Sequence, residues 1–460
     1  MPPKSNYLSP LDWLMPNTYI RQILCFPSTH PDIPRILQNA LPGLVADVQY
    51  LLSGVVRNGS PTGSVSLSDA YQTPDDLLSW QDLSSSLDYP TLKRANFSPG
   101  ALTSAEILPQ DTQPPLSNPA PVFRAQLSLI REGFLLCVAV HHRTTDVTGF
   151  GALFKMWASH CRTGGSEPVG FDGKWLDRRA LFDLESVVGE TPSGTLPNLL
   201  SPRELAVKVS KLEDANRSPV EFKTSIFFFP DATLKELKGA VNRHITTLET
   251  QTDVTWVSSS DVLTAILWSA IIRAETPPPG TYSPGDTSTI GVPVNFCSRY
   301  NPPLPKDYVG AAFFMTSATA SWDDLISLSN PTTSSQTPNA VLLDHKSLCK
   351  LSTIAIAVRA ALGRVHEKAV QNALSYVASQ SDISSIKLGP PHDGVSLVSW
   401  ADEGVYDLQW GTGVGRCEAV RIPAWRGRRY PVVLPRVPGT EASEEPTIYY
   451  RGQIFYKWQS

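Results

Sequence analysis

The most constraining feature of the sequence is an uninterrupted apolar run, Phe134 to Val140, that leads directly into His141 and His142. An apolar run of this length between turn signals is typical of a buried strand. From Phe150 onward, apolar residues recur at helical spacing. The two histidines are therefore expected in a tight turn between a buried strand and a helix. A rigid scaffold can hold an imidazole there, at the edge of a cavity.

The residues before this strand predict its neighbours. Residues 122–130 alternate between apolar and polar, and Arg131-Glu132-Gly133 turns that strand back into the apolar run, so the two form a hairpin. Residues 19–26 also read as a strand, and 33–52 carry apolar residues at helical spacing. Residues 58–120 are rich in Ser, Pro and Asp and predict irregular surface with a few strands.

The second half of the chain mixes strands and helices without regular alternation. Residues 162–220 have many prolines and weak periodicity, which predicts a long crossover. Asp231 is expected to cap a helix that follows a strand at 222–229. The remaining predictions are helices at 258–274 and 348–377 and strands at 289–294, 395–400, 432–435 and 447–456. This order favours an α+β fold with mixed sheets over a doubly wound one.

At 460 residues, the chain is too long for one ordinary core. We expect an N-terminal domain of residues 1–200 and a C-terminal domain of residues 221–460. The net charge of −4 gives no reason to expect nucleic acid as a partner. No signal peptide and no apolar run of membrane-spanning length are evident, and the six cysteines show no CxxC spacing. A soluble, cytoplasmic protein is therefore expected.

His142 and Asp146 are the first candidates for chemistry. An imidazole with its ordinary pKa of about 6.5 can accept and return a proton at neutral pH. His141 precedes His142 on the strand, so the two side chains point to opposite sides and only one can face a given cavity. Asp146 could hold the imidazole of His142 as in a catalytic triad, or it could point away and pin the turn through an arginine. The spacing alone leaves both open.

The features together resemble the BAHD acyltransferase family, most nearly its fungal trichothecene O-acetyltransferase type. His142, Asp146 and Gly149 match the family's HxxxD signature, and Asp407-Leu408-Gln409-Trp410-Gly411 is similar to its DFGWG signature. Further matches follow in the family's order along nearly the whole chain: residues 8–12, 258–268, 299–310 and 399–400.

The resemblance implies two similar chloramphenicol-acetyltransferase-like domains with an active-site channel between them. His142 is then the general base that takes the proton from an acceptor hydroxyl. The tetrahedral oxyanion formed from the thioester needs aimed donors. Trp400 is the candidate donor, with Ser399 as a weaker one. The resemblance implies no metal and no covalent enzyme intermediate.

The remaining site residues are assigned mainly to support. In the family the HxxxD aspartate pairs with an arginine. Cys297 stands where that arginine is expected, which leaves Arg299 as the local substitute for the partner of Asp146. Gly149 and the second signature (Asp407, Trp410 and Gly411) are expected to shape the site. Contacts to CoA are expected from Ser399 and from Ser258, Ser259 and Ser260 at a helix start. Ordinary N-capping by Ser258 or Ser259 explains that helix start equally well.

The resemblance implies a CoA-dependent O-acyltransferase, most nearly an O-acetyltransferase, acting on a small secondary metabolite of the terpenoid or polyketide class. Acyl-CoA is then a co-substrate, with no bound cofactor, and the protein is expected to be a monomer. Two alternatives stay open at this point. One is a condensation-type enzyme that takes its acyl group from a carrier protein. The other is a degenerate binding protein with the same fold, suggested by Cys297 and the altered second signature.

Overall fold

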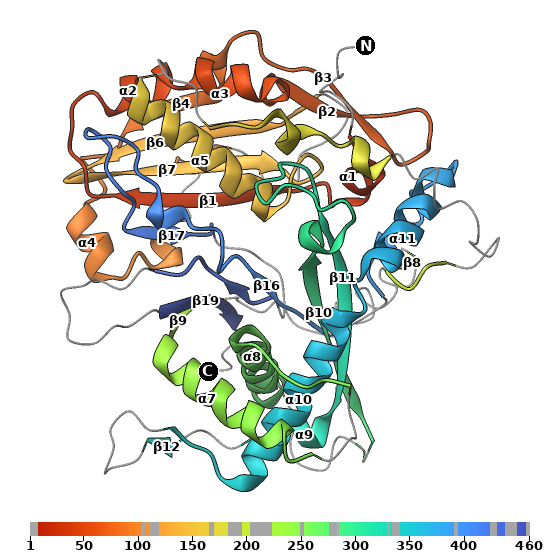
Figure 1. Cartoon of the computed structure of the whole chain (residues 1–460). Coiled ribbons are helices and arrows are strands. Elements are labelled where there is room, and N and C mark those ends of the chain that lie inside the picture. Colours follow the sequence, from red (N-terminus) through yellow and green to blue (C-terminus); the bar gives the residue numbers. More distant parts are fainter. Residues whose placement is uncertain are drawn as a thin grey trace.

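The computed structural model describes residues 8–102, 106–109, 119–164, 170–182, 196–202, 223–248, 253–275, 283, 285–328, 332–333, 341–390, 394–423, 430–437 and 449–456. Two layered halves lie one above the other in Figure 1, with strands β10 and β11 running between them. The architecture is the expected α+β mixture of mixed sheets and helices.

The first half is built on a five-stranded mixed sheet with the strand order β17-β1-β7-β6-β4. Its strands are β1 (Tyr19–Phe26), β4 (Leu78–Asp82), β6 (Phe123–Ile130), β7 (Gly133–His141) and β17 (Ala419–Arg421). The predicted hairpin is formed, with β6 and β7 antiparallel. Every residue of β7 is buried, which confirms that the apolar run is a strand covered on both faces.

Helices α2 (Ile33–Asn39), α3 (Leu41–Asp47) and α5 (Val147–Thr163) cover one face of this sheet (Figure 1). The other face packs on α4 (Tyr89–Arg94) and the residues around it. The helical stretch predicted at 33–52 is in fact α2, α3 and a 3₁₀ turn. It breaks near residue 40 because Pro42 lacks the N–H that would continue the first helix and instead suits the start of the next.

The second half holds two further sheets against a layer of helices. A three-stranded sheet has the order β11-β10-β15, and a four-stranded sheet has the order β16-β18-β19-β9. The helices packed against them are α7 (Asp231–Ile245), α8 (Ser259–Glu275), α9 (Trp322–Ile326) and α10 (His345–Gly363). The strands are β9 (Lys223–Pro230), β10 (Thr287–Asn295), β11 (Phe313–Ser321), β15 (Val395–Ser396), β16 (Val398–Ser399), β18 (Val432–Val433) and β19 (Tyr449–Tyr456).

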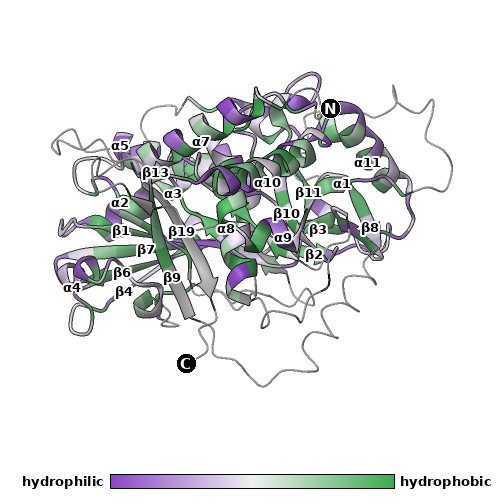
Figure 2. Ribbon diagram, turned by 90° about the horizontal axis from the view of Figure 1, so that it is seen from below, coloured by the Kyte–Doolittle hydropathy of each residue, from purple (hydrophilic) through white to green (hydrophobic). Residues whose placement is uncertain are grey.

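Smaller elements complete the described structure. They are α1 (Pro10–Leu14), β2 (Ser53–Arg57), β3 (Val65–Asp69), β5 (Ala120–Pro121), β8 (Leu200–Pro202), β12 (Thr332–Thr333), β13 (Val341–Leu342), α11 (Glu367–Ser379) and β14 (Ile386–Leu388). Figure 2 shows that β6, β7 and α8 are mostly hydrophobic. No helix in the described ranges is long and apolar enough to cross a membrane.

Two further predictions about helices are wrong. The helix predicted over 348–377 is two helices, because α10 ends at Gly363 and His366 starts α11 by accepting the N–H of Ala369 (3.4 Å). Asp231 does not cap α7. It is the first residue of that helix and forms an ion pair with Lys235 (2.5 Å).

The two halves interleave near the C-terminus. Residues Val405, Tyr406 and Trp410 belong to the core of the first half, and β17 forms an edge strand of its sheet. The first core is therefore completed by chain that follows the second half in sequence. The domain division near residue 221 stays a prediction.

Candidate functional site

A cavity of about 930 Å³ is lined by residues from both halves. The first half contributes the start of β1 and the turn that follows β7, and the second contributes β10, β11 and the segment that begins at β16. The wall is mostly apolar, with ionisable side chains set into it: Tyr19, Arg21, His142, Asp146, Cys297, Lys306, Asp402, Glu403 and Tyr430. Such a composition is typical of a small-molecule site.

His142 lies on this wall at the point predicted from the sequence, one residue after β7 ends. Its Nδ1 is 3.1 Å from the carbonyl oxygen of Thr145. A carbonyl oxygen can only accept, so Nδ1 carries the proton and Nε2 is left with a free lone pair. Burial lowers the pKa of His142 below its ordinary value, which keeps the ring neutral at pH 7. The side chain is thus in the form a general base requires.

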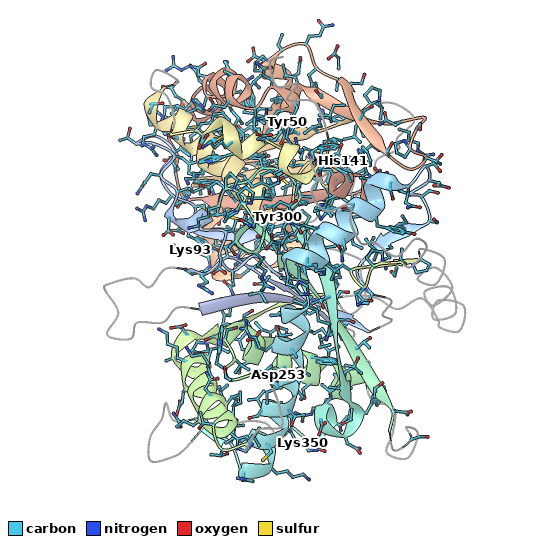
Figure 3. All side chains as sticks on the ribbon, turned by 45° about the vertical axis from the view of Figure 1, so that its right-hand side comes forward. Tyr50, Lys93, His141, Asp253, Tyr300 and Lys350 are labelled. Carbon is cyan, nitrogen blue, oxygen red and sulfur yellow. The ribbon has the colours of Figure 1, made fainter. Side chains whose placement is uncertain are left out.

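His141 is buried and is not among the residues that line the cavity. Its Nε2 is 3.1 Å from Asn17 Oδ1, and its Nδ1 accepts the N–H of Arg143 (3.2 Å). Burial lowers the pKa of His141 to about 3, so this ring is neutral as well. Figure 3 shows His141 inside the N-terminal half. Of the two histidines, the structure brings His142 to the cavity.

Asp146 begins α5 and ties it to the second half. Its Oδ1 accepts the N–H groups of Thr148 (2.9 Å) and Gly149 (3.1 Å), and its Oδ2 accepts the N–H of Ala312 (2.9 Å). Among the described residues, neither His142 nor an arginine contacts this carboxylate. Burial raises the pKa of Asp146 to about 6 despite these bonds. The geometry is that of a brace between the halves.

Arg299 does not take the place predicted for it. Its guanidinium donates to the carbonyl oxygens of Leu362 (2.6 Å) and Val365 (2.8 Å), at the C-terminal end of α10. The last carbonyls of a helix lack intrahelical partners and attract cations, so Arg299 is satisfied there. The prediction that it pairs with Asp146 is wrong, because backbone N–H groups, which no side-chain pattern reveals, supply the partners.

A second buried carboxylate, Asp12, lies beside this brace. Its Oδ1 accepts the N–H of Ala311 (3.0 Å), so Asp12 and Asp146 receive consecutive backbone amides. Its Oδ2 accepts the N–H and the hydroxyl of Ser9, the N-cap of α1, and forms an ion pair with Arg178 (3.0 Å). Neither Asp12 nor Arg178 was predicted as a site residue, since one lies in a short motif and the other in the expected crossover.

Gly149 is required by the close approach of the two halves. A Cβ at this position would lie 2.6 Å from the carbonyl oxygen of Val309 and 2.2 Å from Thr145 Oγ1. Real Cβ atoms do not approach other heavy atoms so closely, so only glycine lets α5 begin here. The sequence predicted Gly149 as support for the site, and the geometry supplies a reason.

Trp400 and Ser399 both line the cavity. Trp400 is half-buried, and its backbone N–H donates to the carbonyl oxygen of Val433 (2.8 Å). Ser399 is exposed, and its hydroxyl oxygen accepts the N–H of Ala401 (3.4 Å). The structure therefore brings both predicted donors to the same cavity as His142.

The second signature lies away from the cavity. Trp410 is fully buried, with ring centroids 5.6 Å from Trp157 and 5.8 Å from Phe26. Asp407 is exposed in a 3₁₀ turn. Gly411 has a φ of +95°, which favours glycine. These positions agree with a supporting role.

Ser258, Ser259 and Ser260 do not line the cavity. Ser258 and Asp261 cap each other at the start of α8: the N–H of Asp261 donates to Ser258 Oγ (3.2 Å), and the N–H of Ser258 donates to Asp261 Oδ2 (2.6 Å). The capping alternative therefore accounts for Ser258. A contact of the three serines with CoA stays a prediction.

Glu403 is a cavity residue that the sequence analysis missed. Gln22 Nε2 lies 2.8 and 2.7 Å from its two carboxyl oxygens, and burial raises the pKa of Glu403 to about 8. Its Cγ would lie 2.9 Å from a Cβ at Gly151, so α5 packs closely against it. A lone glutamate after Ser-Trp carries no local signal of burial.

Replacing Glu403 with glutamine should remove part of the pH dependence of stability. A glutamate of pKa near 4.3 when unfolded and about 8 when folded keeps its proton in the folded state over that interval, so rising pH favours unfolding. The loss is at most about 1.4 kcal/mol per pH unit. In thermal unfolding, the stability of Glu403→Gln relative to the wild type should therefore be higher at pH 8 than at pH 5. Glu418→Gln, on an exposed glutamate paired with Lys93 (2.8 Å), is the control. If the stability of Glu403→Gln depended on pH as steeply as that of the wild type, the expectation would be contradicted.

Within the described ranges, no group of three or more His, Cys, Asp or Glu side chains could hold a metal ion. The wall instead offers a neutral imidazole, an indole and a hydroxyl around an apolar space. This set can move a proton and donate hydrogen bonds.

Comparisons with known proteins agree with this chemistry. Residues 92–420 match the Transferase family, and residues 19–161 match the trichothecene 3-O-acetyltransferase-like N-terminal domain. O-acetyltransferase astG of Aspergillus oryzae is 26% identical over 95% of this chain and 96% of its own. O-acetyltransferase ptmV of Penicillium ochrochloron is also 26% identical, over 72% of this chain and 69% of its own.

The fold has a solved counterpart. The crystal structure of Fusarium graminearum TRI101 complexed with coenzyme A and deoxynivalenol superimposes with a TM-score of 0.76 at 19% identity. The superposition covers 98% of this chain and 94% of that one. This likeness confirms the predicted fold class.

Proposed function

Because the chain belongs to the Transferase family, the BAHD acyltransferases, we propose that it is a CoA-dependent O-acetyltransferase acting on a hydroxyl of a small secondary metabolite. Membership makes the protein an acyltransferase that transfers groups other than aminoacyl groups. The fungal relatives ptmV and astG are named O-acetyltransferases, and acetyl-CoA is accordingly the proposed donor. The observation that carries the proposal is the neutral His142, with Nε2 free, on the wall of the cavity between the halves.

The proposed reaction is a direct transfer. His142 Nε2 takes the proton of the acceptor hydroxyl while that oxygen attacks the thioester carbonyl, and a tetrahedral oxyanion results. Its collapse breaks the C–S bond, and the CoA thiolate recovers the proton from the imidazolium. A positioned general base contributes on the order of 10²–10⁴-fold in rate.

The Thr145 carbonyl supports this base without a carboxylate. It accepts from Nδ1, so it fixes the tautomer and stabilises the imidazolium that forms when Nε2 takes the proton. Asp146, whose oxygens are occupied by backbone N–H groups, acts as the brace of the turn and not as a triad member.

Trp400 is the proposed oxyanion donor. Trp400→Phe keeps the ring and removes the indole N–H, so kcat should fall on the order of 10²-fold while the KM for acetyl-CoA stays within a few-fold. Trp256→Phe, on an exposed tryptophan that does not line the cavity, is the matched control. An unchanged kcat in Trp400→Phe would contradict the oxyanion role and show that the indole only lines the cavity.

The acceptor is proposed to be a hydroxylated terpenoid or polyketide. Such molecules present a large apolar body with few polar groups, and the apolar wall with its few polar side chains suits them. A cytoplasmic location and a monomeric state stay predictions from the sequence.

The proposal is tested by incubating the purified protein with acetyl-CoA and a panel of hydroxylated terpenoids and polyketides. The expected products are an O-acetyl ester, identified by mass, and one free CoA thiol per ester. Ligand binding without turnover across the panel and across several acyl-CoA donors would contradict it and favour a binding protein.

A further inference from the structure

We propose that Arg178 is the positioning residue of the catalytic turn, taking the part that the HxxxD aspartate and its arginine were expected to play. The inference rests on the proposed role of His142 as the base. Arg178 lies in residues 170–182, one of the described parts of the expected crossover. From there it reaches the turn that carries His142.

The guanidinium of Arg178 is enclosed by groups of the first half. Its side chain is 3% exposed, and its Nη2 donates to the carbonyl oxygen of Thr144 (2.6 Å). Its Nε faces Asp12 Oδ2 at 3.0 Å, and its Cζ lies 5.0 Å from the ring centroid of Tyr50, whose place in the N-terminal half Figure 3 shows. A planar, always charged guanidinium can donate to a carbonyl while it pairs electrostatically with a carboxylate and lies near an aromatic ring.

The bond to Thr144 reaches the base through the backbone of the turn. The carbonyl of Thr144 belongs to the peptide group that precedes Thr145, and the carbonyl of Thr145 accepts from His142 Nδ1. Two consecutive peptide groups therefore connect the guanidinium to the imidazole. A displacement of about 1 Å at a reacting group can cost on the order of 10²-fold in rate.

The second half of the molecule fixes Arg178 in turn. The carbonyl of Trp175 accepts the N–H of Val309 (2.8 Å), and the carbonyl of Ala180 accepts from the hydroxyl of Tyr300 (2.9 Å). These contacts lie on either side of Arg178 in sequence. Asp12, its counter-ion, also holds the N–H of Ala311. The turn of His142 is thus held in place by both halves through one side chain.

The first test is Arg178→Met, which keeps the length of the stem and removes the fork. We expect kcat to fall roughly 10- to 100-fold while the KM for acetyl-CoA changes less than about threefold. Removing one partner of a buried pair also destabilises the fold, since Asp12 is left uncompensated. Arg178→Lys, which keeps the charge but not the fork, should recover stability more fully than kcat.

A double variant separates positioning from folding. Asp12→Asn combined with Arg178→Met removes both buried charges, so thermal stability should return towards the wild type while kcat stays low. Arg421→Met is the matched control: Arg421 is also fully buried and also donates to backbone carbonyls, those of Phe97 (3.0 Å) and Asn96 (2.7 Å). It should lose stability and keep kcat.

The ¹⁵N NMR spectrum of His142 gives a readout that does not depend on turnover. The wild type should show the Nδ1–H tautomer alone, and Arg178→Met should show both tautomers. Wild-type kcat in the double variant, or an unchanged tautomer in Arg178→Met, would overturn the inference. Loss of the tautomer preference in a protein that turns over no acyl donor would support it and contradict the proposed function instead.

Discussion

Replacing His142 with alanine is expected to lower kcat by about 10³-fold and to leave the fold intact. The variant loses the Nε2 lone pair that accepts the hydroxyl proton, and no other imidazole lines the cavity among the described residues. The His142 side chain is half-buried and its Nδ1 bonds the carbonyl oxygen of Thr145 (3.1 Å), so the free energy of unfolding should change little. Steady-state kinetics with acetyl-CoA measure kcat, and calorimetric binding of CoA shows whether the folded site still takes the donor.

His345→Ala is the matched control for this variant. His345 is exposed at the start of α10 and is not a cavity residue, so kcat should equal that of the wild type. Equal turnover by His142→Ala and the wild type would refute the general-base assignment. Loss of CoA binding along with turnover would instead point to a role in donor binding.

Replacing Asp146 with alanine is expected to destabilise the protein by about 2–4 kcal/mol, because three backbone N–H groups lose their acceptor. Turnover should fall as well, since Ala312 would no longer be tied to the turn of His142. Urea denaturation measures the free energy of unfolding, and kcat is measured below the transition.

Two comparison variants divide the effect. Ser321→Ala removes only an N-cap, at α9, where Ser321 Oγ accepts the N–H of Asp324 (3.1 Å), so it should cost about 1 kcal/mol and leave kcat unchanged. Asp146→Asn keeps one oxygen for the cap but offers a competing amide donor, so it should lie between the wild type and Asp146→Ala. A loss in Asp146→Ala no larger than that in Ser321→Ala would show that the bond to Ala312 contributes nothing.

The sequence predicted the site where local pattern determines structure. The apolar run before His142 predicts the nine-residue strand that is buried along its whole length. The apolar spacing from Phe150 predicts the helix after it. The order of short motifs along the chain then predicted the family and the fold. His142, Trp400 and Ser399 were all expected at the site, and the structure brings them to one cavity.

The partners of the site were beyond prediction because they are set by packing between distant segments. Asp146 is held by the amide of Ala312, 166 residues away, and an amide carries no side-chain signature. Arg178 and Asp12 meet only when the crossover folds against α1, and Glu403 is buried only because α5 and β1 close over it. Arg299 was expected to pair with Asp146 because it lies two residues after Cys297, which stands where the partner was expected, whereas its guanidinium in fact bonds the carbonyl oxygens at the end of α10.

The most direct measurement of the central claim is a single-turnover comparison of two donors with the same hydroxylated acceptor. One donor is acetyl-CoA and the other is an acetyl group on a carrier-protein thioester. We predict that acetyl-CoA yields one acetyl ester and one free CoA per enzyme, that the intact mass of the enzyme never gains an acetyl group, and that His142→Ala forms no ester on this timescale. Transfer from the loaded carrier alone, or an acetylated enzyme before product appears, would contradict direct transfer from acyl-CoA by His142.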